Sequence, residues 1–199
     1  MKTKSAVIVA LGTTLIGASP LAAQAPEAAA QPGSRLEFLI PSGTLIPTGA
    51  QRDAIKRGNM TALQVNYVTN EVFAITSTIG WARSRDLTNA AEAKLDLFTY
   101  DVGAEARAPR LWSGKSVTFT PFAGLGAGGR SYNHRDLATD ATHNVAGYGS
   151  LGGELGVKQV KVRVEARDYV TGFKPLTGAG AGRTGNDVVV MVGVRFGQR

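Results

Sequence analysis

The stretch VKVRVEARDYV, residues 160–170, alternates apolar and charged side chains with almost no error. In an extended strand, successive side chains point to opposite faces of the sheet. The two faces of this stretch carry Val160, Val162, Val164 and Ala166 on one side, and Lys161, Arg163, Glu165 and Arg167 on the other. The fold depends on which of these faces points inward, and on what fills the space it faces.

The same two-residue alternation recurs along the chain, interrupted by Gly, Asn, Asp and Pro, and it predicts an all-β protein. We expect eight strands, at residues 35–41, 60–68, 72–83, 94–107, 117–131, 144–157, 160–171 and 186–196. Long polar connections, 42–59, 84–93, 132–143 and 172–185, alternate with short ones, 69–71, 108–116 and 158–159. In an antiparallel up-and-down barrel, this alternation would put every long loop at one rim.

Residues 1–23 have the pattern of a secretory signal peptide, with a basic start, an apolar run and small residues before a cleavage site after Ala23. The apolar run is too short to span a bilayer as a helix. We expect an exported chain in which residues 24–34 are a flexible lead-in and residues 35–196 form the barrel. Although 22 basic residues face 15 acidic ones, export makes nucleic acid an unexpected partner.

The chain contains no cysteine, which excludes disulfides, thiolate metal sites and cysteine nucleophiles. Its two histidines, His134 and His143, fall in one expected loop, and their spacing matches no metal motif. Around His134, SYNHRDLA offers no convincing serine or carboxylate partner in register, and GAGAGR at 178–183 lacks the Lys-Ser/Thr pair of a phosphate loop. We therefore expect no enzyme activity, no metal and no cofactor.

Alternation alone fits a soluble barrel with its apolar face inside and a membrane barrel with its apolar face outside. The apolar face is almost free of charge along the expected strands, as a lipid-facing band requires. The polar face carries equal numbers of acids and bases, which suits a narrow lumen because unpaired buried charge is costly. This predicted lumen charge network comprises Glu37, Asp101, Glu105, Glu154 and Glu165 with Arg107, Lys161, Arg163, Arg167 and Arg195.

Aromatic and glycine residues also favour the membrane arrangement. Aromatics fall near strand ends, among them Trp81 and Phe98 towards the long loops, as in the aromatic girdles of membrane proteins. On the polar face of 117–131, glycines at every second position leave room for bulky side chains in a narrow interior.

The tight turn predicted at residues 158–159 sets the register of the strands on either side of it. It places Glu154 opposite Arg163, so we expect these two side chains to form an ion pair in the lumen. Further along, the same register pairs Ser150 with Arg167 and Tyr148 with Tyr169.

These features resemble the small eight-stranded outer-membrane barrels, the porin-family group that contains the OmpA-type transmembrane domain and its OmpX-like relatives. The resemblance covers residues 35–196 and rests on the strand count, the loop alternation, TPFAGLGAGGRSY at 120–132 and the final strand DVVVMVGVRF. In this family the assembly machinery recognises an alternating last strand closed by an aromatic, which here implies Val188, Val190, Val192, Val194 and Phe196. The three residues after Phe196 depart from the family pattern.

The resemblance implies an eight-stranded antiparallel transmembrane β-barrel in the outer membrane of a Gram-negative type envelope. We expect a monomer with a structural or adhesin-like surface role, whose partners are outer-membrane lipids, lipopolysaccharide and the barrel assembly machinery. A small channel, an outer-membrane enzyme acting on lipid A and a secreted soluble ligand-binding barrel are the alternatives. Basic residues in or beside the long loops either contact lipopolysaccharide phosphates or are solvated: Arg52, Lys56, Arg57, Arg83, Arg85, Arg130, Arg135 and Arg183.

Overall fold

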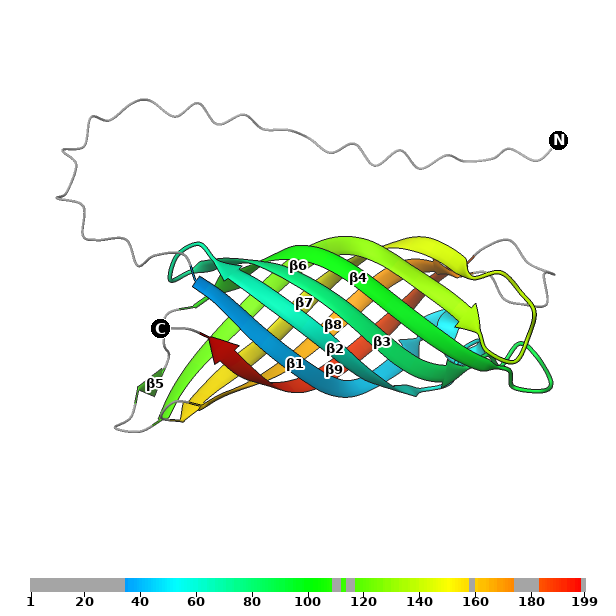
Figure 1. Ribbon diagram of the computed structural model, residues 1–199, viewed down its shortest axis with the longest axis horizontal. Coiled ribbons are helices and arrows are strands. Elements are labelled where there is room, and N and C mark those ends of the chain that lie inside the picture. The colour runs from blue at the N-terminus through cyan, green and yellow to red at the C-terminus, as the bar shows by residue number, and fades with distance from the viewer. Residues whose placement is uncertain (1–34, 109–111, 114–116, 158–159, 174–182, 198–199) are drawn as a thin grey trace, which may run out of the picture. The chain divides into compact units, whose positions relative to one another are not determined.

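Eight long antiparallel strands form the protein in the computed structural model, which describes residues 35–108, 112–113, 117–157, 160–173 and 183–197 (Figure 1). The predicted signal peptide, the lead-in at 24–34 and the turn at 158–159 lie outside the described residues. The long strands are β1 (Arg35–Thr48), β2 (Gly58–Val68), β3 (Phe73–Arg85), β4 (Lys94–Arg107), β6 (Val117–His134), β7 (Thr142–Val157), β8 (Val160–Phe173) and β9 (Arg183–Gly197).

The sheet closes on itself. Each long strand pairs with its neighbours in sequence, and β1 completes the circle by pairing with β9. A two-residue strand, β5 (Trp112–Ser113), pairs with the start of β6, while β4 pairs with the rest of β6. Closure gives the backbone N–H and C=O groups partners within the sheet, which a barrel needs in lipid. The predicted all-β, eight-stranded antiparallel up-and-down barrel is confirmed.

Several strands extend further towards the long loops than the sequence predicted. The expected connection 42–59 is wrong, because β1 continues to Thr48 and β2 begins at Gly58. Likewise β6 continues to His134 and β7 begins at Thr142. The cross-strand hydrogen bonds persist there although the clear apolar and polar alternation is lost, so periodicity alone underestimates strand length. Between β1 and β2 lies a five-residue 3-10 helix, η1 (Gly49–Asp53).

Within the part of the chain that the structure describes, no helix is long and apolar enough to cross a membrane.

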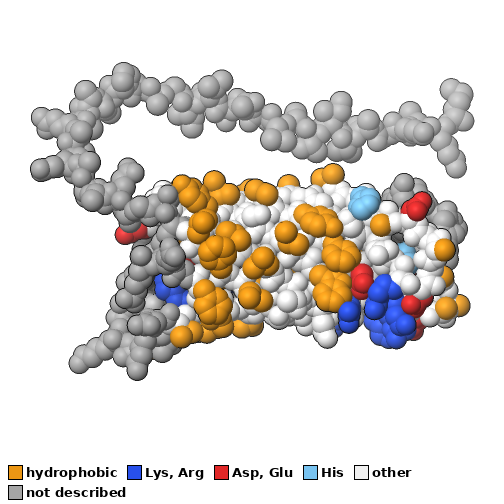
Figure 2. Space-filling model, in the orientation of Figure 1, with side chains coloured by type: hydrophobic (Ala, Val, Ile, Leu, Met, Phe, Trp, Pro, Cys, Tyr) orange, Lys and Arg blue, Asp and Glu red, His pale blue; other side chains and the backbone are white. Residues whose placement is uncertain are grey.

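The apolar face of the strands points outward. Val102, Leu125 and Leu151 expose more than 60% of their surface, and hydrophobic side chains are spread along the outside of the barrel (Figure 2). On β8 the opening stretch follows the same rule, with Val160 and Val164 exposed and Arg163 and Arg167 buried. The barrel is therefore arranged inside out relative to a soluble one, as a lipid-facing exterior requires.

Candidate functional site

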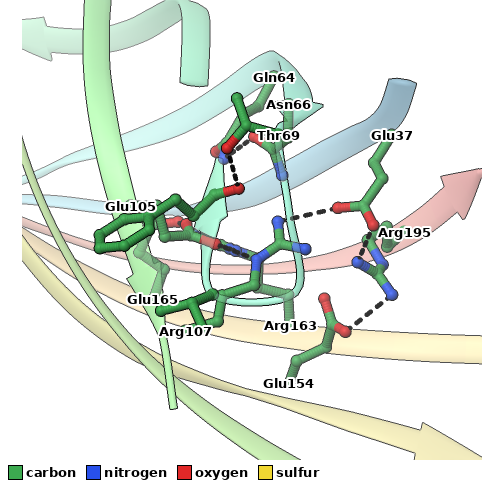
Figure 3. A network of polar contacts seen from close by, with 12 residues as sticks. Glu37, Gln64, Asn66, Thr69, Glu105, Arg107, Glu154, Arg163, Glu165 and Arg195 are labelled. Carbon is green, nitrogen blue, oxygen red and sulfur yellow. Dashed lines mark hydrogen bonds and ion pairs between the residues drawn. The ribbon is translucent and has the colours of Figure 1, made fainter. Parts of the chain in front are cut away.

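The candidate site is the charged half of the lumen, towards the short turns. The ten residues of the predicted charge network all lie here, and all are buried except the half-buried Lys161. Ion pairs join them into one chain in which bases and acids alternate. Figure 3 shows the part of it from Glu154 to Glu165. In order, the chain runs Lys161, Glu154, Arg195, Glu37, Arg107, Glu105, Arg163, Glu165, Arg167 and Asp101.

The part of this chain nearest the rim ties together strands that are not neighbours. Arg107 on β4 donates from Nη2 to Glu37 on β1 at 2.9 Å and from Nε to Glu105 at 2.7 Å. Arg195 on β9 donates to Glu37 and lies 3.0 Å, Nη2 to Oε1, from Glu154 on β7. The carboxylate of Glu37 thus receives two arginines from different sides of the barrel. Hydrogen bonds between ionised groups are stronger than those between neutral groups.

Arg163 lies in the middle of this series of ion pairs, and its contacts correct one prediction. The register is as expected, with Glu154 opposite Arg163, Ser150 opposite Arg167 and Tyr148 opposite Tyr169. The ion pair predicted between Glu154 and Arg163 is nevertheless wrong. Arg163 reaches across the lumen to Glu105, at 3.1 Å from Nη1 to Oε1, and also donates to Glu165.

The physical reason for this difference is the length of arginine in a narrow barrel. Register fixes which Cα atoms are opposite, but a long side chain can meet acids from strands on the far wall as easily as its own neighbour. The guanidinium of Arg163 lies 3.5 Å from the ring centroid of Phe122, an additional favourable contact. Glu154, which lies closer to the rim, forms its ion pairs with Arg195 and Lys161 instead.

The inner end of this series of ion pairs also hydrogen-bonds to neutral side chains. Arg167 donates to Glu165 at 2.5 Å and to Gln64 at 2.7 Å. The hydroxyl of Tyr169 donates to Asp101 at 2.5 Å, and Arg167 lies 3.5 Å from the same carboxylate. These contacts fix the positions of the charged groups relative to one another.

The glycines of the polar face leave space for an aromatic side chain, as the sequence suggested. A Cβ at Gly126 would lie 2.6 Å from Tyr148 Cε1, and one at Gly103 would lie 2.3 Å from the Tyr148 hydroxyl. Tyr148 therefore fills the width that these glycines leave open, and its ring packs 5.3 Å from that of Tyr169. This packing narrows the lumen further.

A second polar cluster, closer to the long loops, was missed by the sequence reasoning. Arg130, which was expected beside a loop, is fully buried and bonds Asp187, and its guanidinium lies 4.1 Å from the ring of Tyr169. Gln51 of η1 donates to Asp187 at 3.2 Å and to Tyr132 at 3.4 Å. Continuing the alternation of β6 past residue 128 would have placed Arg130 inside. No sequence signal points to Gln51.

Around this second cluster, apolar side chains pack the loop-side half of the lumen. It is filled by a packed group that includes both tyrosines of the β7–β8 pair, and its buried members are Leu45, Ile55, Met60, Ala62, Ala82, Leu95, Leu97, Tyr132, Ala146, Tyr148, Tyr169, Val189 and Met191. The expected charge-paired plug thus accounts for one half of the interior, and a hydrophobic plug occupies the other. Leu45 and Tyr132 lie beyond the predicted ends of β1 and β6, so the underestimated strand lengths concealed part of this group.

Both histidines have polar partners that the sequence reasoning did not find. His134 Nε2 lies 3.1 Å from the buried carboxylate of Asp86, and His143 Nδ1 lies 2.7 Å from Ser131 Oγ. Asp86 follows β3 and reaches His134 only because β4 brings β3 and β6 together. No carboxylate among the described residues hydrogen-bonds to His143. Among these residues there is also no group of three or more His, Asp or Glu that could hold a metal ion.

The five residues of the predicted assembly strand lie on the outer wall of β9. Val190, Val192, Val194 and Phe196 are exposed there and Val188 is partly buried. Phe196 is opposite Phe38 of β1, at the short-turn rim where the barrel closes.

Comparison with protein families decides what kind of barrel this is. The family model of the outer membrane protein beta-barrel domain matches residues 10–196. The chain belongs to this family. The match agrees with the resemblance to small outer-membrane barrels and places the protein in the bacterial outer membrane. A comparison with curated protein sequences finds no significant match.

Solved structures of two outer-membrane proteins share the fold of this family member, and a third matches it less well. Neisserial surface protein A (NspA) is 14% identical, with a TM-score of 0.53 over 80% of this chain and 95% of NspA. The outer membrane protein AlkL, determined in DMPC lipid bilayers, is 10% identical, with a TM-score of 0.51 over 89% of this chain and 95% of AlkL. The attachment invasion locus protein Ail of Yersinia pestis is 11% identical, with a TM-score of 0.40 over 82% of this chain and 97% of Ail.

Proposed function

We propose that this protein is a non-conducting structural barrel of the outer membrane that presents its long loops for interaction at the cell surface. The observation that carries the proposal is the filled lumen. Its short-turn half contains an alternating chain of buried ion pairs, and its loop-side half contains packed apolar side chains. A barrel of eight strands has room inside for either side chains or a narrow water-filled path, and here side chains occupy the interior.

The proposal includes export through the predicted signal peptide and insertion as a monomer with the long loops outside the cell. Membrane fractionation tests it directly. The protein should sediment with the outer membrane, and unboiled samples should migrate differently from boiled samples on a gel. Recovery as a soluble periplasmic protein without detergent would contradict the proposal.

The small channel is the alternative against which the lumen argues most directly. Planar bilayers that contain the purified protein should show no single-channel steps above the noise of protein-free membranes. The triple variant Leu95→Ala/Leu97→Ala/Tyr132→Ala removes volume from the apolar half of the lumen only, and it should also stay closed because the ion-pair chain still fills the short-turn half. Single-channel steps from the wild-type protein above the noise of protein-free membranes would refute the closed lumen.

An enzyme acting on lipid A is a second candidate, which one contact favours. The hydrogen bond between Ser131 Oγ and His143 Nδ1, at 2.7 Å, is the pairing expected of a nucleophile and its base. Such a pair also needs a group that orients the histidine, and the described residues provide no carboxylate bonded to His143. Mass spectra of lipid A from cells with the wild-type protein, the Ser131→Ala variant and no protein distinguish the two functions. A mass loss that depends on Ser131 would establish the enzyme.

A further inference from the structure

The outer wall of the barrel carries one carboxylate within its apolar surface. Asp168 is exposed on the outer face of β8, between the exposed side chains of Ala166 and Val170. The other exposed charges that the structure describes on the outer faces of the long strands lie near loop-side strand ends: Arg83, Arg85 and Lys94. A charge that faces lipid is costly, and such groups usually have a partner and a function. Asp168 therefore marks a candidate contact site.

Asp168 has no favourable electrostatic partner among the described residues. It forms no hydrogen bond or ion pair with them, and its interaction with the buried carboxylate of Asp187 on β9 is repulsive. Its neighbours across the sheet are Gly149 of β7 and Val188 of β9, and neither offers a polar side chain. The carboxylate is thus available to a cation from outside the barrel.

The wall beside Asp168 is almost bare of side chains. Gly147 and Gly149 face outward on β7, whereas Val145 and Leu151 on the same face expose 82% and 68% of their surface. A Cβ at Gly149 would meet no atom within 4 Å, and one at Gly147 would come no closer than 3.9 Å. Packing within the barrel therefore does not require these two glycines, although glycine weakens a strand. We call Gly147, Gly149 and Asp168 the glycine notch.

The opposite wall of the barrel carries a complementary pair of side chains. Strand β3 is four strands away from β8 in either direction around the closed sheet. Trp81 on β3 is 37% exposed, and the guanidinium carbon of Arg83 lies 4.3 Å from the centroid of its ring. This stacking holds the positive charge of Arg83 close to the level of the indole. Among the described residues Arg83 forms no ion pair, so its charge is also available.

Trp81 and the glycine notch lie at nearly the same height in the membrane. Followed once around the barrel, the register starts at Leu97 and returns to β4 at Arg107, ten residues nearer the short turns. Half a circuit therefore descends by about five residues. Half a circuit from Trp81 ends at Val164 of β8. Asp168 is four residues above Val164, and so only about 3 Å below the level of Trp81.

We propose that Trp81 and Arg83 of one copy of this chain dock into the glycine notch of a second copy in the plane of the membrane. The indole lies against the bare backbone of Gly147 and Gly149, and the guanidinium forms an ion pair with Asp168. Small residues let membrane-embedded surfaces approach closely. Arginine suits the pair because its planar guanidinium can donate two parallel hydrogen bonds to one carboxylate.

The contact is head-to-tail, because its two halves lie on opposite walls of each barrel. Each copy can therefore bind one neighbour on either side, and a contact of this kind extends instead of closing into a ring. The expected assembly is a row of barrels with their long loops on the same side, formed after single barrels have inserted. This inference goes beyond the proposed surface role and adds a partner, a second copy of the chain.

The test measures energy transfer between donor-labelled and acceptor-labelled copies in DMPC vesicles over a series of protein-to-lipid ratios. Since the chain has no cysteine, Glu71→Cys gives each copy a single label in the short turn between β2 and β3. Wild-type transfer should exceed that of randomly distributed barrels. Asp168→Asn and Arg83→Gln should each weaken association about 30-fold, the effect of truncating one partner of a desolvated charge pair. Arg85→Gln is the matched control, because Arg85 lies two residues further along the same face of β3.

Gly149→Leu separates the contact from the stability of the single barrel. The added side chain enters open space in one barrel but fills the notch that a second copy needs. The variant should therefore keep the unfolding midpoint of the wild type and reduce energy transfer to the random level. A merely structural role of Gly149 would instead change the midpoint.

Charge reversal identifies the pairing. Arg83→Asp alone and Asp168→Arg alone should fail to associate, whereas an equal mixture of the two should regain transfer, because each contact then joins opposite charges. Each variant is first checked for the mobility shift on boiling, which reports a folded barrel. Asp168→Asn and Gly149→Leu keep the test decisive if Asp168→Arg does not fold.

The inference is overturned if wild-type barrels show only random energy transfer, or if Asp168→Asn or Gly149→Leu associates as the wild type does. Failure of the two folded charge-reversed variants to associate with each other would overturn it as well. Binding of the notch to a different, basic membrane protein without self-association would also refute the second copy as the partner. In each case, correct outer-membrane fractionation with a mobility shift would leave the proposed function intact.

Discussion

Arg163→Met tests whether the buried ion pairs form one electrically coupled chain. Methionine keeps an unbranched, polarisable side chain over Phe122 while removing the charge. Removing one partner of a buried ion pair costs about 3–5 kcal/mol. We expect about 3 kcal/mol, the lower end of the range, because Glu105 keeps Arg107 at 2.7 Å and Glu165 keeps its other arginine at 2.5 Å.

The alternation of the chain predicts which second substitution restores stability. Without Arg163, the outer segment, from Lys161 to Glu105, keeps three bases and three acids and is neutral. The inner segment, Glu165, Arg167 and Asp101, keeps one base against two acids and has a net charge of −1. Replacing Glu165 by glutamine makes both segments neutral. Replacing Glu105 instead leaves one segment at +1 and the other at −1.

The assay is urea unfolding of the folded barrel in detergent micelles or lipid vesicles, followed by tryptophan fluorescence and by gel mobility. The variant Arg163→Met/Glu165→Gln should recover at least about 1.5 kcal/mol of the lost free energy of unfolding, because neutral replacement of buried charges is often tolerated. The variant Arg163→Met/Glu105→Gln has the same composition of charge and should be no more stable than Arg163→Met alone. Equal stabilities of the two double variants would refute the alternating chain as an energetic unit.

Three further tests, which use five substitutions, concern the exterior, the lumen and assembly. Leu125→Arg at mid-strand should lower the free energy of unfolding by about 2–4 kcal/mol, whereas Val145→Arg near the loop rim should lower it by at most about 1 kcal/mol. Urea unfolding in vesicles measures both values. Similar losses for the two variants would contradict the assigned membrane position. Gly128→Ala should destabilise the barrel, because its Cβ would meet the Tyr100 carbonyl oxygen at 1.9 Å, while Gly149→Ala, with no atom within 4 Å, should leave the midpoint of thermal unfolding nearly unchanged. Phe196→Ala should lower the amount of protein in the outer membrane without changing the unfolding midpoint of the purified barrel; normal outer-membrane levels would contradict its role in the assembly signal.

The fold was largely predictable because alternate residues of a membrane barrel face two different environments, lipid outside and a narrow lumen inside. Lipid excludes charge from one face, and a narrow lumen requires balanced charge on the other. The other strands show the same alternation, so only one orientation of VKVRVEARDYV is consistent with them: valines towards lipid and charges towards the lumen. The register of β7 and β8 followed from a tight turn, and Tyr148 is opposite Tyr169 as expected. Strand ends were less predictable, since beyond the membrane β1 and β6 are held by cross-strand hydrogen bonds rather than by alternating polarity.

The amino-acid sequence by itself determined the inside-out barrel, the residues that face the lumen near the short turns and the equality of their charges. Only the tertiary structure decided which acid meets which base. Arg163 bonds Glu105 on the far wall instead of Glu154 opposite it, because strand tilt and closure set the distances across a lumen that arginine can span. The same closure brings Gln51, Arg130 and Asp187 together from three separate segments. Contacts of this kind depend on the three-dimensional path of the whole sheet, which no local pattern encodes.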